Sequence, residues 1–425
     1  MRGAVVLVLL LLPALAPAQP TRVMVIGDSM SEEYAHELPF SAPDSNPLNP
    51  NTRNWIESLD ALRSADLDFG SDGAYPDLRG LGFKYNWGVP GATAEFWAEV
   101  LGSSLLDDPQ YLTSKFNLLN SLDDIDVVVL FVGGNDVSSD YGNLYNNAPS
   151  PGEEDAYLAH IRFIIETLRD ERSDVPIVLV NVPDVGATPD IQEDHPDPVR
   201  RLDATAHIAD LNTRLASAVM DDPHLVVVDL FALTTLILDP APLTIGPVTM
   251  IKSYDRENRP NFLFCKEKFH PASGASALIG NTIVGGINAV LGTTIAPLTD
   301  TEIAARILEL KPYLDWIATF PGADADLIAD PDRDGLPNIG EFALDTHPLS
   351  PDAPAIAPGV PASLTYSPNP MASDTVEVIA EESTNLQSWS PVPFFRLTSN
   401  SDASLSAELP DGIRAFARLG FPLAP

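Results

Sequence analysis

The sequence predicts a three-layer α/β domain with a five-stranded parallel sheet, followed by a small C-terminal β module. Three observations support this prediction. Short apolar runs rich in β-branched residues alternate with amphipathic stretches from residue 22 to residue 291, which is typical of parallel strands covered by helices. The composition then changes near residue 296, where an acidic segment follows. Short strand-like runs return after residue 370.

The elements of the sheet and its helical layers follow in order along the chain. The expected strands are residues 22–26, 84–87, 126–132, 176–180 and 225–230. The expected helices are residues 54–65, 153–172, 198–220 and 272–291. Residues 39–51 are rich in Pro, Asn and Ser, and we expect a long loop there that helps to shape a substrate site.

The N-terminus has the pattern of a secretory signal peptide. Arg2 precedes an apolar run, and Ala16 and Ala18 offer a small-x-small cleavage site. We expect cleavage after residue 18 and export to the extracellular space or the periplasm; an uncleaved anchor helix is the alternative. No later run approaches about 18 uninterrupted apolar residues, so no membrane span is expected.

The charge balance limits the partners of the protein. The 425 residues contain 60 Asp and Glu against 24 Lys and Arg, a formal charge of −36. Such a charge repels nucleic acids and anionic membranes, and it fits either a saline habitat or a need for solubility. The one cysteine, Cys265, excludes an intramolecular disulfide and a cysteine-rich metal site.

The composition also predicts the division of the chain. We expect the signal peptide at 1–18, the α/β domain at 19–295, a helical spacer with an acidic loop at 296–350, and a proline-rich linker with a β module at 351–425. The spacer is expected to be helical over 300–319, and seven prolines between 348 and 370 predict a semi-rigid linker. Strand-like runs of the module are 375–380, 393–398 and 413–419. The sequence does not identify the module's partner.

Polar residues follow three of the predicted strands. Ser29 comes directly after the first strand in Gly-Asp-Ser, Gly91 follows the second, and Asn135 follows the third. Ligands bind at the carboxyl ends of the strands in open α/β sheets, so a nucleophile and two hydrogen-bond donors are expected to meet there. Each motif alone also suits an ordinary turn or helix cap.

A histidine precedes the last predicted helix of the α/β domain. His270 lies three residues after Glu267, so a carboxylate can orient the imidazole while its other nitrogen faces a serine.

The four motifs, in this chain order, resemble those of the SGNH hydrolases, also called GDSL esterases or lipases. The resemblance covers roughly residues 22–291 and implies a three-layer, flavodoxin-like αβα fold. It also implies Ser29 as nucleophile, His270 as general base, and an oxyanion hole from the Ser29 and Gly91 N–H groups and the Asn135 amide. The family usually has Asp where this chain has Glu267, so either Glu267 or a backbone carbonyl is expected to orient His270.

A twelve-residue acidic loop suits calcium. Oxygen ligands at positions 1, 3, 5, 9 and 12 and Gly at position 6 fit the calcium-loop pattern, with a backbone carbonyl at position 7. The expected ligands are Asp330, Asp332, Asp334, the Leu336 carbonyl, Asn338 and Glu341. The loop resembles single dockerin or thrombospondin type 3 repeats, which implies a structural Ca²⁺ ion that takes no part in catalysis. A solvated acidic linker is the alternative.

Together these features predict a secreted serine esterase that needs no cofactor for catalysis. Its expected substrates are carboxylic esters, either small molecules or polysaccharides, with O-acetyl groups on carbohydrate as the first hypothesis. A short-chain lipase or carboxylesterase is the alternative, and a large exposed apolar groove beside Ser29 would favour it. A non-catalytic extracellular binding protein is the second alternative, which loss of the Ser29–His270 contact would favour.

Overall fold

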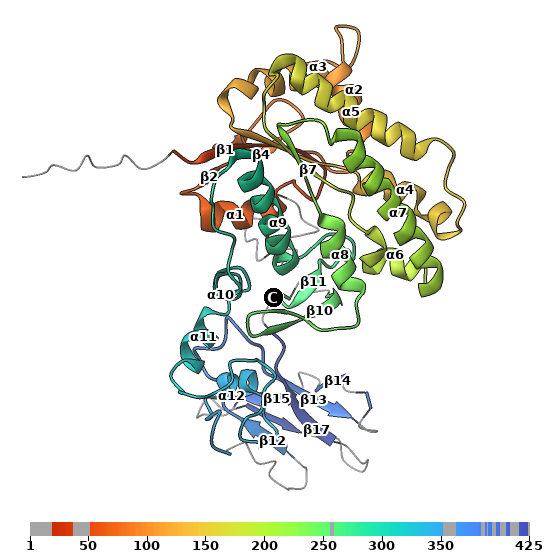
Figure 1. The fold of residues 1–425 in the computed structure, drawn as a ribbon. Helices are drawn as coiled ribbons and strands as arrows, with labels where there is room; N and C mark the ends of the chain where they lie inside the picture. The colour runs from red at the N-terminus through yellow and green to blue at the C-terminus, as the bar shows by residue number, and fades with distance from the viewer. Residues whose placement is uncertain are drawn as a thin grey trace, which may run out of the picture.

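The computed structural model describes residues 19–36, 52–255, 259–351, 363–383, 387–388, 390–392, 397–399, 405–408 and 416–423. The expected signal peptide and the expected loop at 39–51 lie outside the described residues. Figure 1 shows the α/β domain with its helices on both sides of the sheet, and the C-terminal strands at one end of the molecule.

The central sheet has six parallel strands in five positions. β1 (Thr21–Gly27) pairs with β6 (Val127–Phe131) on one edge. On its other edge, β2 (Leu67–Asp68) and β5 (Asn86–Gly88) pair with successive parts of β1 and share one position. β7 (Ile177–Val180) and β8 (Leu225–Val228) complete the order. The predicted five-stranded, flavodoxin-like parallel sheet is confirmed.

Alternate residues of each strand face opposite helical layers. Val23 and Val25 pack in one core, whereas Met24 and Ile26 pack in the other, as the two-residue period of a strand requires. The first layer contains α1 (Trp55–Arg63) and α9 (Ser273–Leu291). The second contains α2 (Ala94–Gly102), α3 (Pro109–Asn120), α4 (Gly134–Tyr145), α5 (Glu153–Glu171), α6 (Pro189–Asp194) and α7 (Pro198–Val219).

The helix α9 is long and apolar enough to cross a membrane by length and composition. The fold gives another reason for this composition, because 56% of its most apolar window is buried inside the structure. A Cβ at Gly286 would lie 2.5 Å from Val228 and 2.7 Å from Val178. Small residues therefore let α9 pack closely against β7 and β8.

The four predicted helices of the α/β domain are present, but several other helices were not predicted. The predicted strand 225–230 ends at Val228, because Asp229 caps a helix, α8 (Leu230–Leu238), with its side chain accepting the Ala232 N–H. α4 was missed because its sequence is polar and contains two glycines. Beyond the central sheet, β3 (Asp72–Ala74) and β4 (Leu81–Phe83) form a hairpin, and β9 (Leu243–Ile245), β10 (Val248–Tyr254) and β11 (Phe262–Phe264) form a small sheet.

The segment after residue 295 packs on the α/β domain. The predicted helix at 300–319 is interrupted: α10 (Asp300–Glu302) passes into a π-helical turn (Ile303–Ile307), and α11 (Lys311–Ile317) follows. Hydrogen bonds from Arg63 of α1 attach this segment to the α/β domain. Its guanidinium donates to the Ala296 and Pro297 carbonyls and to both Glu302 carboxylate oxygens. The short helix α12 (Asn338–Leu344) is buried along its whole length.

The C-terminal part forms two small antiparallel sheets, so the predicted small β module is confirmed. One contains β12 (Ser363–Tyr366), β16 (Leu405–Glu408) and β15 (Leu397–Ser399); the other contains β14 (Ser390–Pro391), β13 (Ile379–Ser383) and β17 (Phe416–Gly420). β12 lies inside the predicted linker 348–370. The prediction of a linker is therefore wrong for this end of the segment, because Asn369 binds the Phe342 and Ala343 carbonyls and holds it against α12.

Candidate active site

The register of the sheet brings three of the predicted residues to one edge. Gly27 at the end of β1 pairs with Gly88 of β5 on one side and with Phe131 of β6 on the other. Ser29, Gly91 and Asn135 follow these residues within two to four positions. The three motifs therefore leave the sheet at the same carboxyl edge, as predicted.

Ser29 and His270 meet although they are 241 positions apart in the sequence. Ser29 Oγ lies 2.7 Å from His270 Nε2, which is within the range of a serine–histidine hydrogen bond. The histidine is carried by the turn between β11 and α9, and this turn is closed by a hydrogen bond from the Cys265 N–H to the His270 carbonyl (2.9 Å). The pair has the geometry of a nucleophile and its base.

Glu267 lies beside the other nitrogen of the histidine. Its Oε1 is 3.3 Å from His270 Nδ1. The same carboxylate accepts the N–H groups of Phe269 (2.9 Å) and His270 (2.8 Å). The glutamate side chain, longer than the aspartate usual in the resembled family, thus both closes the turn and faces the imidazole. This arrangement suits an orienting role.

Two of the three expected oxyanion donors, Asn135 and Gly91, have different surroundings. Asn135 Nδ2 donates to the Ala92 carbonyl (3.0 Å) and lies 3.5 Å from Asp28 Oδ2, so its amide is held in place by the loop after β5. Gly91 has a φ of +74°, and a Cβ built there meets nothing within 4 Å. Its backbone adopts a conformation that favours glycine and faces open space.

Two carboxyls near the serine are shielded from solvent, Asp28 fully and Asp136 in part. Burial raises the pKa of Asp28 to about 7, although the Met30 N–H donates to it. Burial likewise raises the pKa of Asp136 to about 6, while the Ala94 N–H donates to both of its oxygens. The Asp28 carboxyl is therefore largely protonated below pH 7, which limits the negative charge near the serine.

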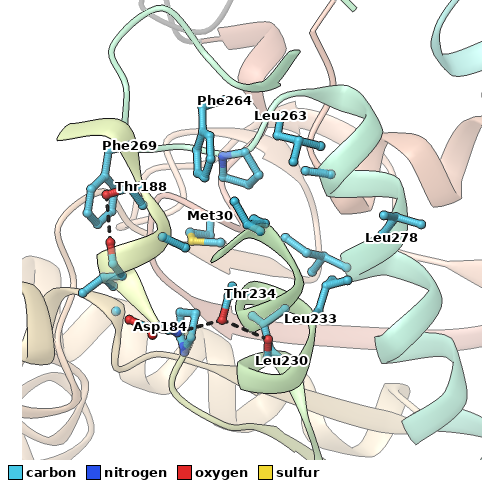
Figure 2. Close-up of a pocket in the computed structure, with 18 of the residues that line it drawn as sticks. Met30, Asp184, Thr188, Leu230, Leu233, Thr234, Leu263, Phe264, Phe269 and Leu278 are labelled. Atoms are coloured by element: carbon cyan, nitrogen blue, oxygen red, sulfur yellow. Dashed lines mark hydrogen bonds between the residues drawn. The ribbon is translucent and has the colours of Figure 1, made fainter. Parts of the chain in front are cut away.

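An apolar pocket opens beside Ser29 (Figure 2). Ser29, Asn135 and Gly134 line one part of it. The remaining wall is formed mainly by apolar side chains of α8, β9, β11, α9 and the histidine turn: Leu230, Leu233, Ile237, Leu243, Leu263, Phe264, Phe269, Ala275, Leu278 and Ile279. The few polar groups include Asp184, whose N–H donates to Thr234 Oγ1 (2.8 Å). The pocket suits the apolar part of a substrate.

The sequence reasoning did not find this pocket. A signal was present in residues 230–238, Leu-Phe-Ala-Leu-Thr-Thr-Leu-Ile-Leu, which are almost wholly apolar. In the structure only Leu230 of this helix is fully buried. A short apolar helix with incomplete burial is typical of the wall of a binding pocket.

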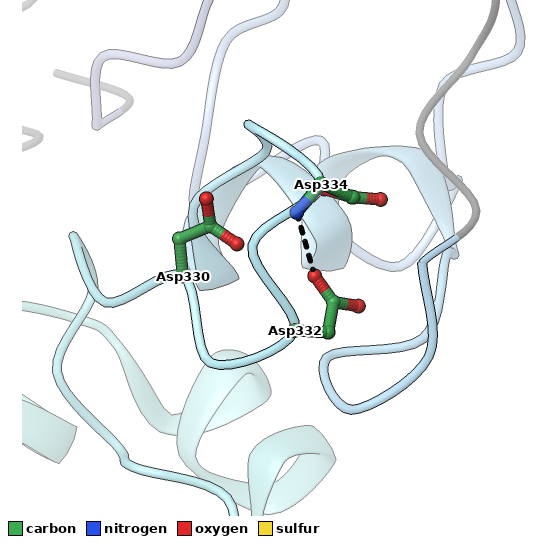
Figure 3. A group of neighbouring side chains, drawn as sticks. All are labelled: Asp330, Asp332 and Asp334. Carbon is green, nitrogen blue, oxygen red and sulfur yellow. Dashed lines mark hydrogen bonds between the residues drawn. The ribbon is translucent and has the colours of Figure 1, made fainter.

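The acidic loop brings part of its expected ligand set together. One carboxylate oxygen from each of Asp330, Asp332 and Asp334 lies within 4.8 Å of the other two, and Figure 3 shows the three side chains. Glu341 is buried in α12 but is not part of this group. The Asn338 amide nitrogen donates to the Asp324 and Asp326 carbonyls, and the Leu336 side chain packs against the C-terminal sheets.

The oxygens of this loop suit a cation. Asp330 Oδ1, Asp332 Oδ2 and Asn338 Oδ1 are buried and have no hydrogen-bond partner among the described residues. Burial raises the pKa of Asp332, and the charges of Asp334 and Asp330 add to this effect. Clustered carboxylates repel one another unless a cation compensates them, so this three-Asp group can bind a metal ion.

One family model matches most of the α/β domain. Residues 23–283 match the family model of the GDSL-like lipases/acylhydrolases. Among the curated proteins, none matches the chain significantly. Similar solved structures include a family 3 carbohydrate esterase from Talaromyces cellulolyticus (16% identity, 64% of this chain and 100% of that chain, TM-score 0.34). A second is a family 3 carbohydrate esterase from Clostridium thermocellum (16% identity, 65% of this chain and 100% of that chain, TM-score 0.34). A third is a catalytic mutant of an acetylxylan esterase from Geobacillus stearothermophilus (12% identity, 64% of this chain and 96% of that chain, TM-score 0.34).

Proposed function

This chain belongs to the GDSL-like lipase/acylhydrolase family and is a carboxylic ester hydrolase, and we propose that it acts through an acyl-enzyme on Ser29 with a preference for esters that carry an apolar acyl group. The observation that carries the proposal is the 2.7 Å contact between Ser29 Oγ and His270 Nε2 in the wall of an apolar pocket. Loss of this contact would have favoured the non-catalytic alternative, and the contact is present.

The proposed mechanism uses the residues at the carboxyl edge of the sheet. His270 Nε2 takes the proton of Ser29 Oγ as this oxygen attacks the ester carbonyl. The N–H groups of Ser29 and Gly91 and the side-chain amide of Asn135 stabilise the oxyanion. His270 then gives the proton to the leaving alcohol oxygen, and a water molecule, deprotonated by the same nitrogen, releases the acid from Ser29. Glu267 holds the imidazole in orientation.

The pocket supports the short-chain lipase or carboxylesterase hypothesis over the O-acetyl hypothesis. An acetyl group carries one methyl and covers little apolar surface, whereas each further buried CH₂ contributes about 0.8 kcal/mol to binding. A chain of several carbons can use the side chains of Leu233, Leu263 and Phe264 in the wall. O-acetyl groups on carbohydrate remain the second candidate, as the sequence predicts for an exported esterase with an appended module.

The test is an acyl-length series with matched controls. We would measure kcat/KM on p-nitrophenyl acetate, butyrate and octanoate and on an O-acetylated polysaccharide, for the wild type and for Ser29→Ala. We expect butyrate or octanoate to exceed acetate by about 10-fold or more, and Ser29→Ala to lose about 1,000-fold or more on every ester.

Other outcomes of this series are equally decisive. A preference for acetate and the acetylated polysaccharide would replace the apolar-acyl proposal by the carbohydrate one. Equal inertness of wild type and Ser29→Ala on all four substrates would favour a binding protein.

We also propose that the three-Asp group holds one structural Ca²⁺, in a single repeat of the dockerin or thrombospondin type 3 kind, with the Leu336 carbonyl, Asn338 and Glu341 completing the ligands. The orphaned buried oxygens of Asp330, Asp332 and Asn338 support this. Hard carboxylate and carbonyl oxygens are what Ca²⁺ prefers, and millimolar extracellular calcium fills even weak sites. This fits a protein that works outside the cytoplasm, as the expected signal peptide suggests.

A further inference from the structure

The turn that carries His270 contains a residue in an unfavourable backbone conformation. Lys268 has a φ of +77°, a left-handed region that costs free energy for a residue with a Cβ. Such a conformation persists where surrounding contacts hold it, and it clusters at functional sites. Lys268 lies two residues before the histidine that contacts Ser29.

The helix α6 holds Lys268 at two points. Lys268 Nζ lies 2.6 Å from Glu193 Oε2, and the Lys268 carbonyl accepts the N–H of Asp190 (3.2 Å). On the other side, Lys268 Nζ lies 5.0 Å from the ring centre of Tyr254 in β10. Glu267 closes the turn from within, whereas Lys268 fastens the same turn to a neighbouring element.

The helix α6 is itself fixed to the pocket wall. Ile191 is buried in the core of the second helical layer, and Thr188, which caps α6, lines the pocket together with Val185 and Ala187. Figure 2 shows Thr188 and Phe269 on the same side of the pocket. A contact between Glu193 and Lys268 therefore joins the histidine turn to this wall.

We propose that Lys268 is a positioning residue, whose ion pair with Glu193 fixes the turn so that His270 stays in register with Ser29. The inference rests on the proposed function of His270 as the base. A small displacement of a reacting group lowers the rate strongly, whereas a partly exposed ion pair contributes little to stability. The pair should thus affect turnover more than unfolding.

The test compares the rate with the stability in matched variants. Lys268→Met keeps the apolar stem and the Cβ but removes the charge, and Glu193→Gln removes the partner charge at constant size. We expect each variant to lower kcat on p-nitrophenyl butyrate by about 3- to 10-fold, with KM within about twofold and the unfolding temperature within about 2 °C of the wild type. The double variant Lys268→Met/Glu193→Gln should be no slower than the slower of the two single variants, because either substitution already breaks the same ion pair.

Two controls make the result specific. The single charge reversals Lys268→Glu and Glu193→Lys should each lower the rate. The double variant Lys268→Glu/Glu193→Lys restores an ion pair of opposite orientation and should recover most of the rate lost. Lys311→Met breaks an ion pair of the same 2.6 Å length on α11, away from the pocket, and should leave kcat unchanged.

Three results would overturn the inference. Single variants with the wild-type kcat would show that the ion pair does not position His270. The same conclusion would follow if the kcat losses of the two single variants multiplied in the double variant. Both leave the proposed function intact, because the wild type would still hydrolyse esters and Ser29→Ala would not. An inert wild type would instead overturn the proposed function and this inference together.

Discussion

The Ser29–His270 site and the acidic loop differ in how the chain assembles them. The site joins residues 241 positions apart, and it depends on the register of β1, β5 and β6 and on the turn before α9. The loop gathers Asp330, Asp332 and Asp334 within five residues, so its own backbone is sufficient. The first arrangement therefore needs the whole α/β fold, whereas the second needs only a local conformation and a cation.

The two regions also differ in what their carboxyls do. Near the serine, Asp28 is buried and Asp136 is partly buried. Burial raises the pKa of both carboxyls, so the negative charge there stays low. The loop instead concentrates charge on partly exposed side chains. We therefore expect substitutions at the site to change turnover and perturbation of the loop to change stability.

The largest expected effect follows removal of the base. His270→Ala should lower kcat on p-nitrophenyl esters by about 1,000-fold or more, some 4 kcal/mol of transition-state stabilisation, because Ser29 then has no proton acceptor. Its unfolding temperature in the presence of calcium should stay near that of the wild type. A His270→Ala enzyme with more than about a tenth of the wild-type rate would show that the base lies elsewhere.

The next largest effect concerns the oxyanion. Asn135→Ala should lower kcat by about 100-fold, or roughly 2.7 kcal/mol, since one of three proposed donors is lost. The matched control is Asn143→Ala, which removes an exposed asparagine near the other end of the same helix, α4, and should keep the wild-type rate. A comparable loss in both variants would attribute the effect to α4 and not to the oxyanion.

Chelation should separate the two regions. Removing calcium with EDTA should lower the unfolding temperature by roughly 5 °C, since a ligand at about 100 times its Kd stabilises by about 2.7 kcal/mol. The initial rate at 25 °C should not change. Ser29→Ala should show the same thermal shift. Loss of activity at 25 °C without a thermal shift would place the ion in the chemistry.

The smallest effect tests the orienting carboxylate. Glu267→Gln should lower kcat by about 10-fold, or 1.4 kcal/mol, because the amide keeps the size of the side chain but loses the charge that faces His270 Nδ1. A wild-type rate would indicate that a backbone carbonyl orients the imidazole. Glu171→Gln makes the same change at an exposed residue at the end of α5 and should keep the wild-type rate.

Much of the site was predictable because each residue lies in a local pattern. Ser29, Gly91 and Asn135 each follow an apolar strand, and parallel strands end at a common edge. The spacing of oxygen-bearing residues in the acidic loop likewise predicted a cation-binding loop. α4 was not predicted, because the Gly-Gly-Asn-Asp motif is typical of a turn, whereas in the structure a helix begins at Gly134, three residues after the end of β6.

Residues close together in the chain encode the five strands, the three motifs that follow strands, the histidine motif before α9 and the acidic loop, so these features could be predicted. Only the tertiary structure decided the apolar pocket, the contact of Lys268 with Glu193, and the packing of Ala372, Val376 and Leu423 in the same core as β1. These features join segments that are distant in the sequence. Their positions depend on how helices and sheets fill the space between them, and no local pattern encodes that.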